Sequence, residues 1–580
     1  MILAIKDDRS SRSLSRKPMP MSPRRPAKRL LTALILAGLA FAAGAQDNVR
    51  LPDLGSSANA LISPQEAQDY GAAMLRQMRA LGMVVDDPLL DDYINDLGFR
   101  LVAACARPRD HFAFFIVKDD EINAFAAPGG YIAVNSGLIT ITRNESELAG
   151  VIAHEIGHIT QNHLQRAFEA SKKDAPLMAL VLLGAIAAGT AGRGAGDAPM
   201  AVLAGGQGLL AQKQINFTRK DEIEADRAGI QTLANAGFDP NAMAAFFGHM
   251  EDVMSAGAGG QVPSFLQDHP VTSDRIADAK ARAGALIAAQ KLRPSGDTLL
   301  KGQWEQITAP MPFVRAPLRL DRNAADPNGL DTYALMRERV RVLAGNAMRL
   351  TTWYGSNLKD HPDFDTPANR YGYALALTHS GRGAQAMAQL QPLLKAHKDS
   401  LILNLALADA ELQAGQRDAA LALYHGLNEQ SPRNKAVALA YATALTDGGD
   451  KTQAGTAADL LRPLLENSDQ PEIYSAYARA SEKAGDGERA GEAFADASYY
   501  SGRPFDAMEQ LKNLLKRDDL SYYARARIQA RIAELTPLVL ELRKRKIETP
   551  DNPATRNGSQ QLGNERCAGN LCFGLGAGSY

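Results

Sequence analysis

Two histidines four residues apart, His154 and His158, constrain the fold of this chain more than any other feature. They lie in an apolar segment, residues 148–160, whose spacing predicts a helix, and positions four apart share one helix face. Both imidazoles can therefore bind a single Zn²⁺. Glu155 follows the first histidine and would lie beside the metal, where a carboxylate can take a proton from water. The alternative is a chance match on an amphipathic helix, but the apolar flanks favour a buried metal-binding helix.

A third metal ligand has to come from another segment. His163 follows the motif, and a continued helix would turn it roughly 180° away from His154, which predicts a polar surface residue. Glu222 and Asp226 are better candidates, because they are four apart and share a face, whereas Glu224 points to the other side. Glu222 can bind zinc while Asp226 accepts the free N–H of a ligand histidine. A solvated acidic helix face is the alternative. Two histidines, one glutamate and an open water position are typical of a catalytic site.

Residues 1–45 resemble a secretory signal, since basic residues precede an apolar run at 30–42 and a small-residue cleavage site follows at 43–45. Uncleaved anchoring is the alternative, although the apolar run is short for a span. Removing this segment, which carries a charge of +7, takes the formal net charge from −1 to −8. No basic stripe remains, so we expect no nucleic-acid binding.

The cysteines suggest little metal chemistry. Cys105 stands alone in an apolar helical pattern and is expected in the core. Cys567 and Cys572 lie in the Gly-rich tail, residues 546–580, which we predict to be disordered. These two could close a small disulfide loop in an oxidising compartment, and their spacing is not that of a convincing metal site.

The segment 46–310 around the histidine motif is predicted to be one metallopeptidase domain. Residues 64–106 read as two helices, and 111–117 read as a strand. A Pro-Gly-Gly sequence interrupts 122–135 and resembles a hairpin turn. The motif helix should start near Asn144, with Glu147 completing a capping box. Strands just before such a helix are where a zincin holds an extended peptide along a sheet edge.

An apolar insertion at 176–210 is divided by a Gly-rich centre, and neither half can span a bilayer alone. It predicts either a buried helical hairpin or a mobile lid or membrane-surface segment beside the active site.

The last third of the chain is repetitive. Gly381, Gly415, Gly449 and Gly485 are 34, 34 and 36 residues apart, each between two predicted helices. This period is typical of tetratricopeptide repeats, predicted here for 365–545 after connecting helices or a linker at 311–364. A non-repeating helical bundle is the alternative. We expect the array and the metal site to have separate cores. The fold class is therefore mainly α (α+β): a zincin-type domain with a small sheet, followed by an α-solenoid.

The order of these features resembles the HtpX and CAAX-prenyl-protease family of zinc metallopeptidases over roughly residues 50–540. The resemblance rests on Leu-Pro-Asp-Leu-Gly at 51–55, Glu-Ile-Asn-Ala-Phe-Ala at 121–126, the histidine motif, the acidic segment 222–226 and the repeats. It implies one Zn²⁺ per chain held by His154, His158 and Glu222. It also implies that Glu155 is the catalytic base and that Asp226 supports catalysis from behind the ligands.

The resemblance extends to a regulatory loop and a substrate strand. Residues 268–276 resemble the family's His-Pro loop, in which a histidine can take the fourth zinc position and hold the enzyme off. His269 matches that histidine, and Arg275 matches an arginine that we expect near the substrate. The strand at Asn123, Ala124 and Phe125 is expected to border the substrate cleft. The insertion 176–210 and the cysteine-bearing tail lie outside the resemblance.

The expected function is a periplasmic zinc endopeptidase of a Gram-negative bacterium, gated by the histidine loop. The resemblance implies that it degrades misassembled outer-membrane proteins and assists their assembly. Expected partners are outer-membrane β-barrel proteins and their assembly machinery, held by the repeats, with a peripheral membrane contact as a further expectation. The alternative is an assembly chaperone or adaptor that acts mainly through the repeats. A phosphate-binding Gly-Lys-Ser/Thr loop is absent from the sequence, which excludes that class of nucleotide-binding enzyme.

Overall fold

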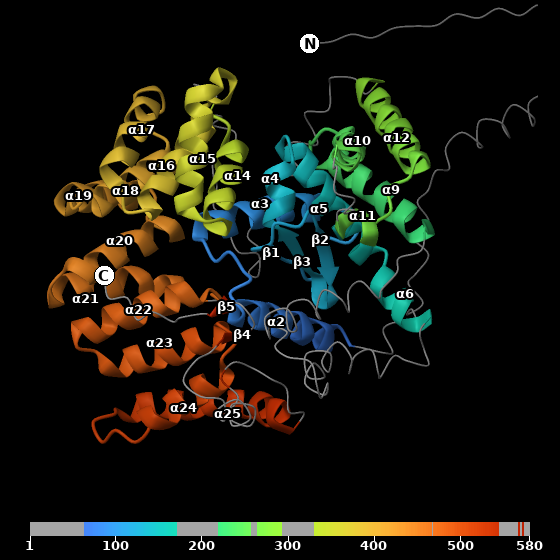
Figure 1. Ribbon diagram of the computed structural model, residues 1–580. Helices are drawn as coiled ribbons and strands as arrows, with labels where there is room; N and C mark the ends of the chain where they lie inside the picture. The colour runs from blue at the N-terminus through green and yellow to red at the C-terminus, as the bar shows by residue number, and fades with distance from the viewer. Residues whose placement is uncertain are drawn as a thin grey trace, which may run out of the picture. The chain divides into compact units, whose positions relative to one another are not determined.

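A computed structural model describes residues 63–170, 219–256, 264–292, 330–466, 468–544 and 551, together with 567–568 and 571–572 (Figure 1). The predicted secretory signal and the insertion 176–210 lie outside these residues. Within the described ranges, no helix has the length and apolar character needed to cross a membrane. In the tail predicted to be disordered, β4 Cys567–Ala568 and β5 Leu571–Cys572 pair as short antiparallel strands, with Cys567 opposite Cys572.

A three-stranded sheet forms the centre of the N-terminal part. Its strands are β1 Ala113–Val117, β2 Ala124–Ala127 and β3 Tyr131–Asn135, in the order β1-β3-β2. β2 and β3 are antiparallel and joined by the short 3-10 turn η2 Pro128–Gly130, which confirms the predicted hairpin. Gly130 has a φ of 82°, and a Cβ there would lie 1.7 Å from the carbonyl oxygen of His111, so only glycine fits. β1 is parallel to β3, which leaves β2 at one edge.

Two helices precede the sheet, as predicted. α2 Pro64–Ala80 starts at a capping box formed by Ser63 and Glu66, and α3 Pro88–Ala104 starts at Asp87, whose side chain accepts the amide of Leu90. α3 packs on β1 through apolar residues spaced three or four apart. Cys105 ends α3 and is half-buried against the core, close to its predicted place.

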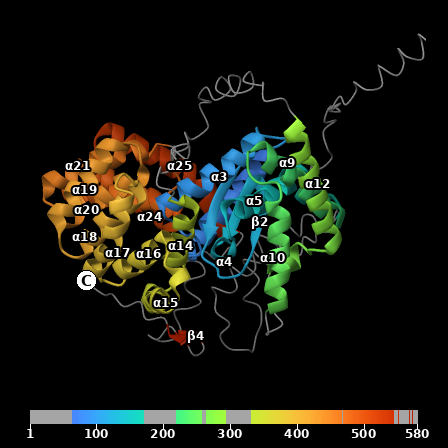
Figure 2. The same ribbon diagram turned by 90° about the horizontal axis from the view of Figure 1, so that it is seen from above.

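The histidine motif lies on α5 Glu145–Thr160, which follows the short helix α4 Ser136–Ile141. Asn144 caps α5 by accepting the amide of Glu147, as predicted, whereas the Glu147 carboxylate accepts the amide of Arg143 rather than that of Asn144. Residues 147–158 are all buried. In both views α5 lies between β2 and α9 Arg219–Asn235 (Figures 1 and 2).

Glycines set the close approach of α5 to α9. A Cβ on Gly157 would lie 2.8 Å from the carbonyl oxygen of Ala225, and one on Gly229 would lie 3.1 Å from the amide nitrogen of His154. Any larger side chain would push the two helices apart, and with them the residues that they carry. Three further helices cover this pair: α10 Ala242–Ala256, α11 Ser264–Asp268 and α12 Ser273–Leu292.

The C-terminal part is a run of helix pairs, shown from yellow to red in Figure 1. Consecutive helices pack on one another. Gly381, Gly415 and Gly485 have φ values of 76°, 80° and 88°, so these glycines follow helices in the left-handed conformation, whereas the fourth glycine of the repeat pattern, Gly449, ends α20 with an extended φ of −94°. The helices are α16 Pro367–His379, α17 Gly383–Ala396, α18 Leu401–Gln413, α19 Arg417–Gln430, α20 Lys435–Gly448, α21 Lys451–Leu461, α22 Pro471–Ala484, α23 Gly487–Tyr500, α24 Pro504–Leu514 and α25 Tyr522–Lys544.

The predicted connecting region contains α14 Thr332–Ala344 and α15 Ala347–Asp360, and α14 is packed rather than loose. The hydroxyl of Tyr333 donates to the carbonyl of Thr142 at 2.9 Å, and Arg339 holds Asp87 with two hydrogen bonds of 2.6 and 2.7 Å. One cluster of buried apolar residues includes Leu90 and Ile152 of the N-terminal part together with Leu405 of α18. The expectation of separate cores is therefore wrong, because α14 joins them.

Candidate active site

Four buried side chains converge where α5 meets α9. On α5, the Nε2 atoms of His154 and His158 are 3.0 Å apart. Glu222 reaches them from α9: its Oε2 lies 3.5 Å from Nε2 of His154, and its Oε1 lies 3.5 Å from Nε2 of His158. His269, just after α11, places its Nδ1 3.4 Å from His154 Nε2 and 3.1 Å from Glu222 Oε1. All four side chains are at most 3% exposed.

The donor atoms suit a tetrahedral metal ion. One nitrogen or oxygen from each of the four residues lies within 4.8 Å of all the others. A zinc ion with bonds of about 2.0–2.1 Å separates its ligand atoms by roughly 3.4 Å, the edge of the tetrahedron. The separations of 3.0, 3.4 and 3.5 Å between neighbouring donors are close to that edge. Nitrogen and carboxylate donors are also the types that zinc prefers, so the residues fit the ion that the sequence predicts.

The charge states of His158 and Glu222 favour metal binding, whereas His154 must give up a proton to a metal. Burial disfavours the charged form of His154, but hydrogen bonds to Asp226 and Glu222 outweigh burial and raise its pKa to about 10. Burial and the neighbouring His154 keep the pKa of His158 well below its usual range, which leaves a neutral imidazole with a lone pair to donate. Burial disfavours the charged form of Glu222, but His269 and His154 outweigh it and hold the pKa of this carboxyl well below its ordinary value. Glu222 is therefore an anion in a buried position, as a metal-binding carboxylate must be.

Asp226 and Arg275 form a second layer behind the donors. Asp226 Oδ1 lies 2.9 Å from the outer nitrogen, Nδ1, of His154. Arg275 donates to both oxygens of Asp226 at 2.7 and 2.8 Å and lies 2.9 Å from Glu222 Oε2. Burial opposes ionisation of Asp226, but hydrogen bonds from Arg275 and His154 lower its pKa. This placement of Arg275 does not fit the expected substrate contact, because its side chain is 1% exposed and committed to these carboxylates.

Glu155 lies on the other side of the donor cluster. Its carboxylate is 1% exposed, and Oε1 has no hydrogen-bond partner among the described residues. Oε1 is 3.6 Å from Nε2 of His269. Burial raises the pKa of Glu155, although His269 and His154 act in the opposite direction. A raised pKa makes this carboxylate a stronger base, which suits proton transfer beside a metal.

The strand expected to border the substrate cleft lies against this site. Asn123, Ala124 and Phe125 are all buried, and β2 packs on α5. Segment 264–268 covers the beginning of the strand: the amide of Phe265 donates to the carbonyl of Ile122 at 3.0 Å. The Asn123 side chain donates to Asp268 at 3.0 Å. The edge strand and the histidine loop are therefore in direct contact.

The expectation that His163 is a surface residue is wrong. His163 is fully buried, and its Nδ1 is 2.8 Å from Nδ1 of His158. The prediction assumed one continuous helix, but α5 ends at Thr160 and Asn162 has a φ of 55°, so α6 His163–Ala170 starts in a new direction. Asparagine tolerates this left-handed conformation better than most residues, and that was the available sequence signal. Glu224 is not remote either, since its Oε2 lies 3.4 Å from His163 Nε2.

Comparison with known proteins relates this chain to metallopeptidases. Residues 88–283 match Peptidase family M48. Beta-barrel assembly-enhancing protease of Escherichia coli (strain K12) is 32% identical over 516 residues, which cover 88% of this chain and 97% of that protein. The protein of the same name from Yersinia pestis is 35% identical over 457 residues, 74% of this chain and 89% of that protein. Mitochondrial metalloendopeptidase OMA1 of Schizosaccharomyces pombe is 27% identical over 184 residues, 32% of this chain and 50% of that protein.

The fold and the site define a metalloprotease, mainly α-helical, with a small sheet beside its histidine-bearing helix. The chain belongs to peptidase family M48.

Proposed function

We propose that this metalloprotease is an endopeptidase that uses one Zn²⁺ held by His154, His158 and Glu222. The observation that carries the proposal is the convergence of these buried donors beside the carboxylate of Glu155. A zinc ion bound there would polarise the scissile carbonyl and acidify the attacking water. Glu155 accepts the proton of that water and passes it to the leaving amine. Asp226 holds His154 in the orientation that presents Nε2 to the donor cluster.

This proposal is tested by zinc content and by cleavage of casein. The purified full-length chain should contain one zinc ion and cleave casein. A chelator should remove both the zinc and the activity, and added zinc should restore them. A chelated, zinc-free protein that still cleaves casein at the original rate would contradict the assignment.

We further propose that His269 closes the site. Its imidazole lies within 3.4 Å of His154 Nε2 on one side and 3.6 Å from Glu155 Oε1 on the other. Water and a scissile carbonyl would need this same space between the donors and the base. The loop also covers the start of β2 through Phe265 and Asp268. Movement of one segment would therefore free the fourth metal position and expose a strand edge on which an extended peptide can pair.

The loop proposal predicts that His269→Ala raises cleavage of casein and of the chain itself, with zinc still bound by three ligands. His249→Ala is a matched control, because His249 is another poorly exposed histidine of this domain, 3.9 Å from Glu147 and outside the donor cluster. Unchanged or lower activity in His269→Ala at normal zinc content would return His269 to the role of a structural residue.

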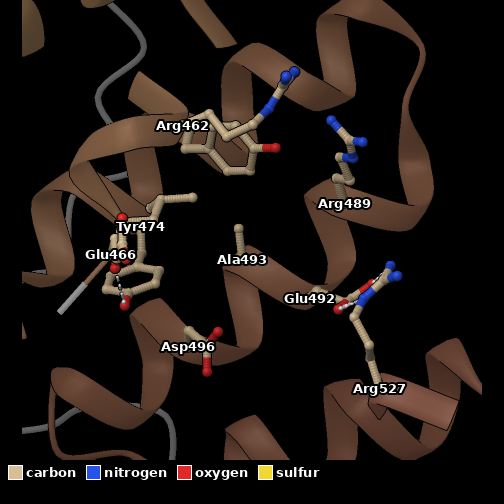
Figure 3. Close-up of a pocket in the computed structure, with 10 residues that line it drawn as sticks. Arg462, Glu466, Tyr474, Arg489, Glu492, Ala493, Asp496 and Arg527 are labelled. Atoms are coloured by element: carbon tan, nitrogen blue, oxygen red, sulfur yellow. Dashed lines mark hydrogen bonds and ion pairs between the residues drawn. The ribbon is translucent and has the colours of Figure 1, made fainter. Parts of the chain in front are cut away.

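The C-terminal helices contain an open cavity of about 420 Å³ (Figure 3). It lies among α22, α23, α25 and the 3-10 turn η5 Arg462–Leu464. Three arginines and three acidic residues share the lining with two tyrosines, a mixture that favours a polar peptide over a lipid chain. The lining residues are Arg462, Leu465, Glu466, Tyr474, Tyr477, Arg489, Glu492, Ala493, Asp496 and Arg527.

We propose that these helices, as tetratricopeptide repeats, hold outer-membrane β-barrel proteins during assembly. The name of the Escherichia coli relative and the helix-pair architecture support this proposal. The predicted secretory signal supports a periplasmic location. The protease site would then degrade barrels that fail to assemble, whereas the closed state of the site would prevent cleavage of correctly folded partners.

The partner cavity is tested with Arg489→Glu, since Arg489 lines the cavity and is 46% exposed. Arg503→Glu is the matched control: Arg503 is 48% exposed, and both arginines pair with an aspartate three residues away. Capture of a purified, unfolded outer-membrane β-barrel protein should fall for Arg489→Glu alone, with casein cleavage unchanged in both variants. Equal capture by both variants would exclude the cavity as the binding site.

An assembly adaptor that rarely cleaves is the second candidate, supported by the distinct cavity outside the donor cluster. Complementation separates the two functions. A strain lacking this protein should regain barrel assembly with the parent chain but only in part with Glu155→Gln. Full rescue by Glu155→Gln would favour the adaptor.

A further inference from the structure

His163 contacts the outer side of a proposed metal ligand. It is the first residue of α6, and its Nδ1 lies 2.8 Å from Nδ1 of His158. The other nitrogen of His158, Nε2, faces His154 Nε2 at 3.0 Å. The two rings meet nearly at right angles, with an interplanar angle of 80° and centroids 4.8 Å apart. His158 is thus held from outside by an imidazole, whereas Asp226 lies at the corresponding nitrogen of His154.

Acidic residues from α9 reach the far side of His163. Its Nε2 is 3.4 Å from Glu224 Oε2 and 3.9 Å from Asp221 Oδ1. Arg166, one turn along α6, pairs with the same two carboxylates at 2.7 and 3.0 Å. These acidic groups and His163 could in principle bind a cation themselves, but the guanidinium already occupies that position.

The carboxylates near His163 favour one tautomer of its ring. Nε2 of His163 lies 3.4 Å from Glu224 Oε2, and because an ionised carboxylate only accepts protons, the ring proton is favoured on Nε2, which leaves a lone pair on Nδ1. That lone pair accepts the Nδ1–H of His158, which leaves Nε2 of His158 as the lone-pair nitrogen facing the donor cluster. Only this tautomer of His158 can bind a metal from Nε2.

We propose that His163 is a positioning residue that sets the tautomer and ring orientation of His158 through a Glu224–His163–His158 relay. This proposal rests on the proposed function, in which His158 is a metal ligand, and it assigns His163 the role of orienting that ligand. The turn at Asn162 makes the relay feasible, because it directs His163 inward, and Arg107 holds that turn by donating to Asn162 Oδ1 at 2.9 Å. The two ligand histidines then have different outer partners, a carboxylate for His154 and a neutral imidazole for His158.

The test measures the Kd for Zn²⁺ by chelator competition, with every variant made in full-length Glu155→Gln protein to prevent self-cleavage. His163→Leu removes the acceptor and should weaken zinc binding about 10–100-fold. His163→Asn places a side-chain oxygen near the position of Nδ1 and should recover most of the affinity. His249→Leu is the control for loss of a poorly exposed histidine outside the donor cluster, and its affinity should match the parent.

A second variant covers the case in which His163→Leu does not fold. Glu224→Ala acts at a partly exposed residue and should weaken zinc binding in the same direction, because His163 is then free to adopt the other tautomer. Folded His163→Leu or Glu224→Ala protein with a Kd within about threefold of the parent would overturn the relay. Glu222→Gln serves as the reference. If Glu222→Gln also binds zinc like the parent, the proposed metal site itself is wrong. If Glu222→Gln loses zinc while the His163 and Glu224 variants keep it, only the role of His163 is refuted.

Discussion

The hydrogen bond between Asn123 and Asp268 should stabilise the closed position of the histidine loop. Asp268 Oδ2 accepts the Asn123 amide at 3.0 Å, directly before His269 in the sequence. Asp268→Ala removes the acceptor while leaving His269 and the proposed metal ligands intact. The closed state should then lose stability relative to the open state, so proteolysis should rise.

The size of this effect follows from the contact. A hydrogen bond to a charged group contributes about 1.5–3 kcal/mol, but Asp268 is half-exposed, so about 1 kcal/mol is the better value. The backbone bond from Phe265 to Ile122 survives the substitution. A change of about 1 kcal/mol shifts the closed-to-open ratio roughly fivefold, and activity should rise by the same factor while the closed state predominates. The activity of His269→Ala, in which the closing side chain is absent, is the largest increase that Asp268→Ala can reach.

The assay is cleavage of fluorescent casein by full-length protein at matched zinc content. Asp268→Asn is the control, because its side-chain oxygen can still accept from Asn123, and it should behave like the parent. Parent-level activity in Asp268→Ala, combined with increased activity in His269→Ala, would show that the Asn123–Asp268 hydrogen bond does not stabilise the closed state. An equal increase for Asp268→Asn and Asp268→Ala would show that charge, rather than the hydrogen bond, holds the loop.

Three further changes test separate parts of the molecule. Glu222→Gln should lose most bound zinc, since a neutral amide is a poor metal ligand, and zinc content equal to the parent would refute its assignment. Gly157→Ala should lower the free energy of unfolding by about 1–3 kcal/mol, because its Cβ would lie 2.8 Å from a backbone oxygen. Gly150→Ala on the same helix is the control: its Cβ would have no contact closer than 3.4 Å, so this variant should be neutral or stabilising. Glu472→Gln should flatten the fall in melting temperature as pH rises from about 4.5 to 7. Burial, with help from Asp86, raises the pKa of Glu472 from 4.5 to about 7, so the folded state alone binds this proton in that window. A pH profile identical to the parent would contradict this reasoning.

The sequence predicted those parts of the fold and site that depend on residues close together in the chain. The apolar period of residues 148–160 and the Asn144 cap defined α5, and the Pro-Gly-Gly sequence defined the β2–β3 turn. Glu222 and Asp226 could be paired because both lie on one helix face. These inferences needed only helix geometry and turn chemistry within about 15 residues.

Features that depend on where a helix ends or on distant packing could not be predicted. His163 was misplaced because a helical wheel has no meaning beyond the end of α5 and the left-handed Asn162. The sequence could not show that Arg275 faces inward, since only the folded loop brings it to Asp226, 49 residues away. The contact of Tyr333 with Thr142 spans 191 residues, and it is such contacts that merge the expected separate cores.

Casein cleavage by zinc-loaded Glu155→Gln shows directly whether Glu155 is the base of a zinc-dependent active site. Glutamine keeps the shape of Glu155 but cannot accept the proton of the attacking water, and Glu155 is not among the grouped metal donors. We expect one zinc ion per chain, as in the parent, and a rate lower by about 10²–10⁴-fold. A zinc-loaded Glu155→Gln protein that cleaves casein at the parental rate would contradict the proposed active site.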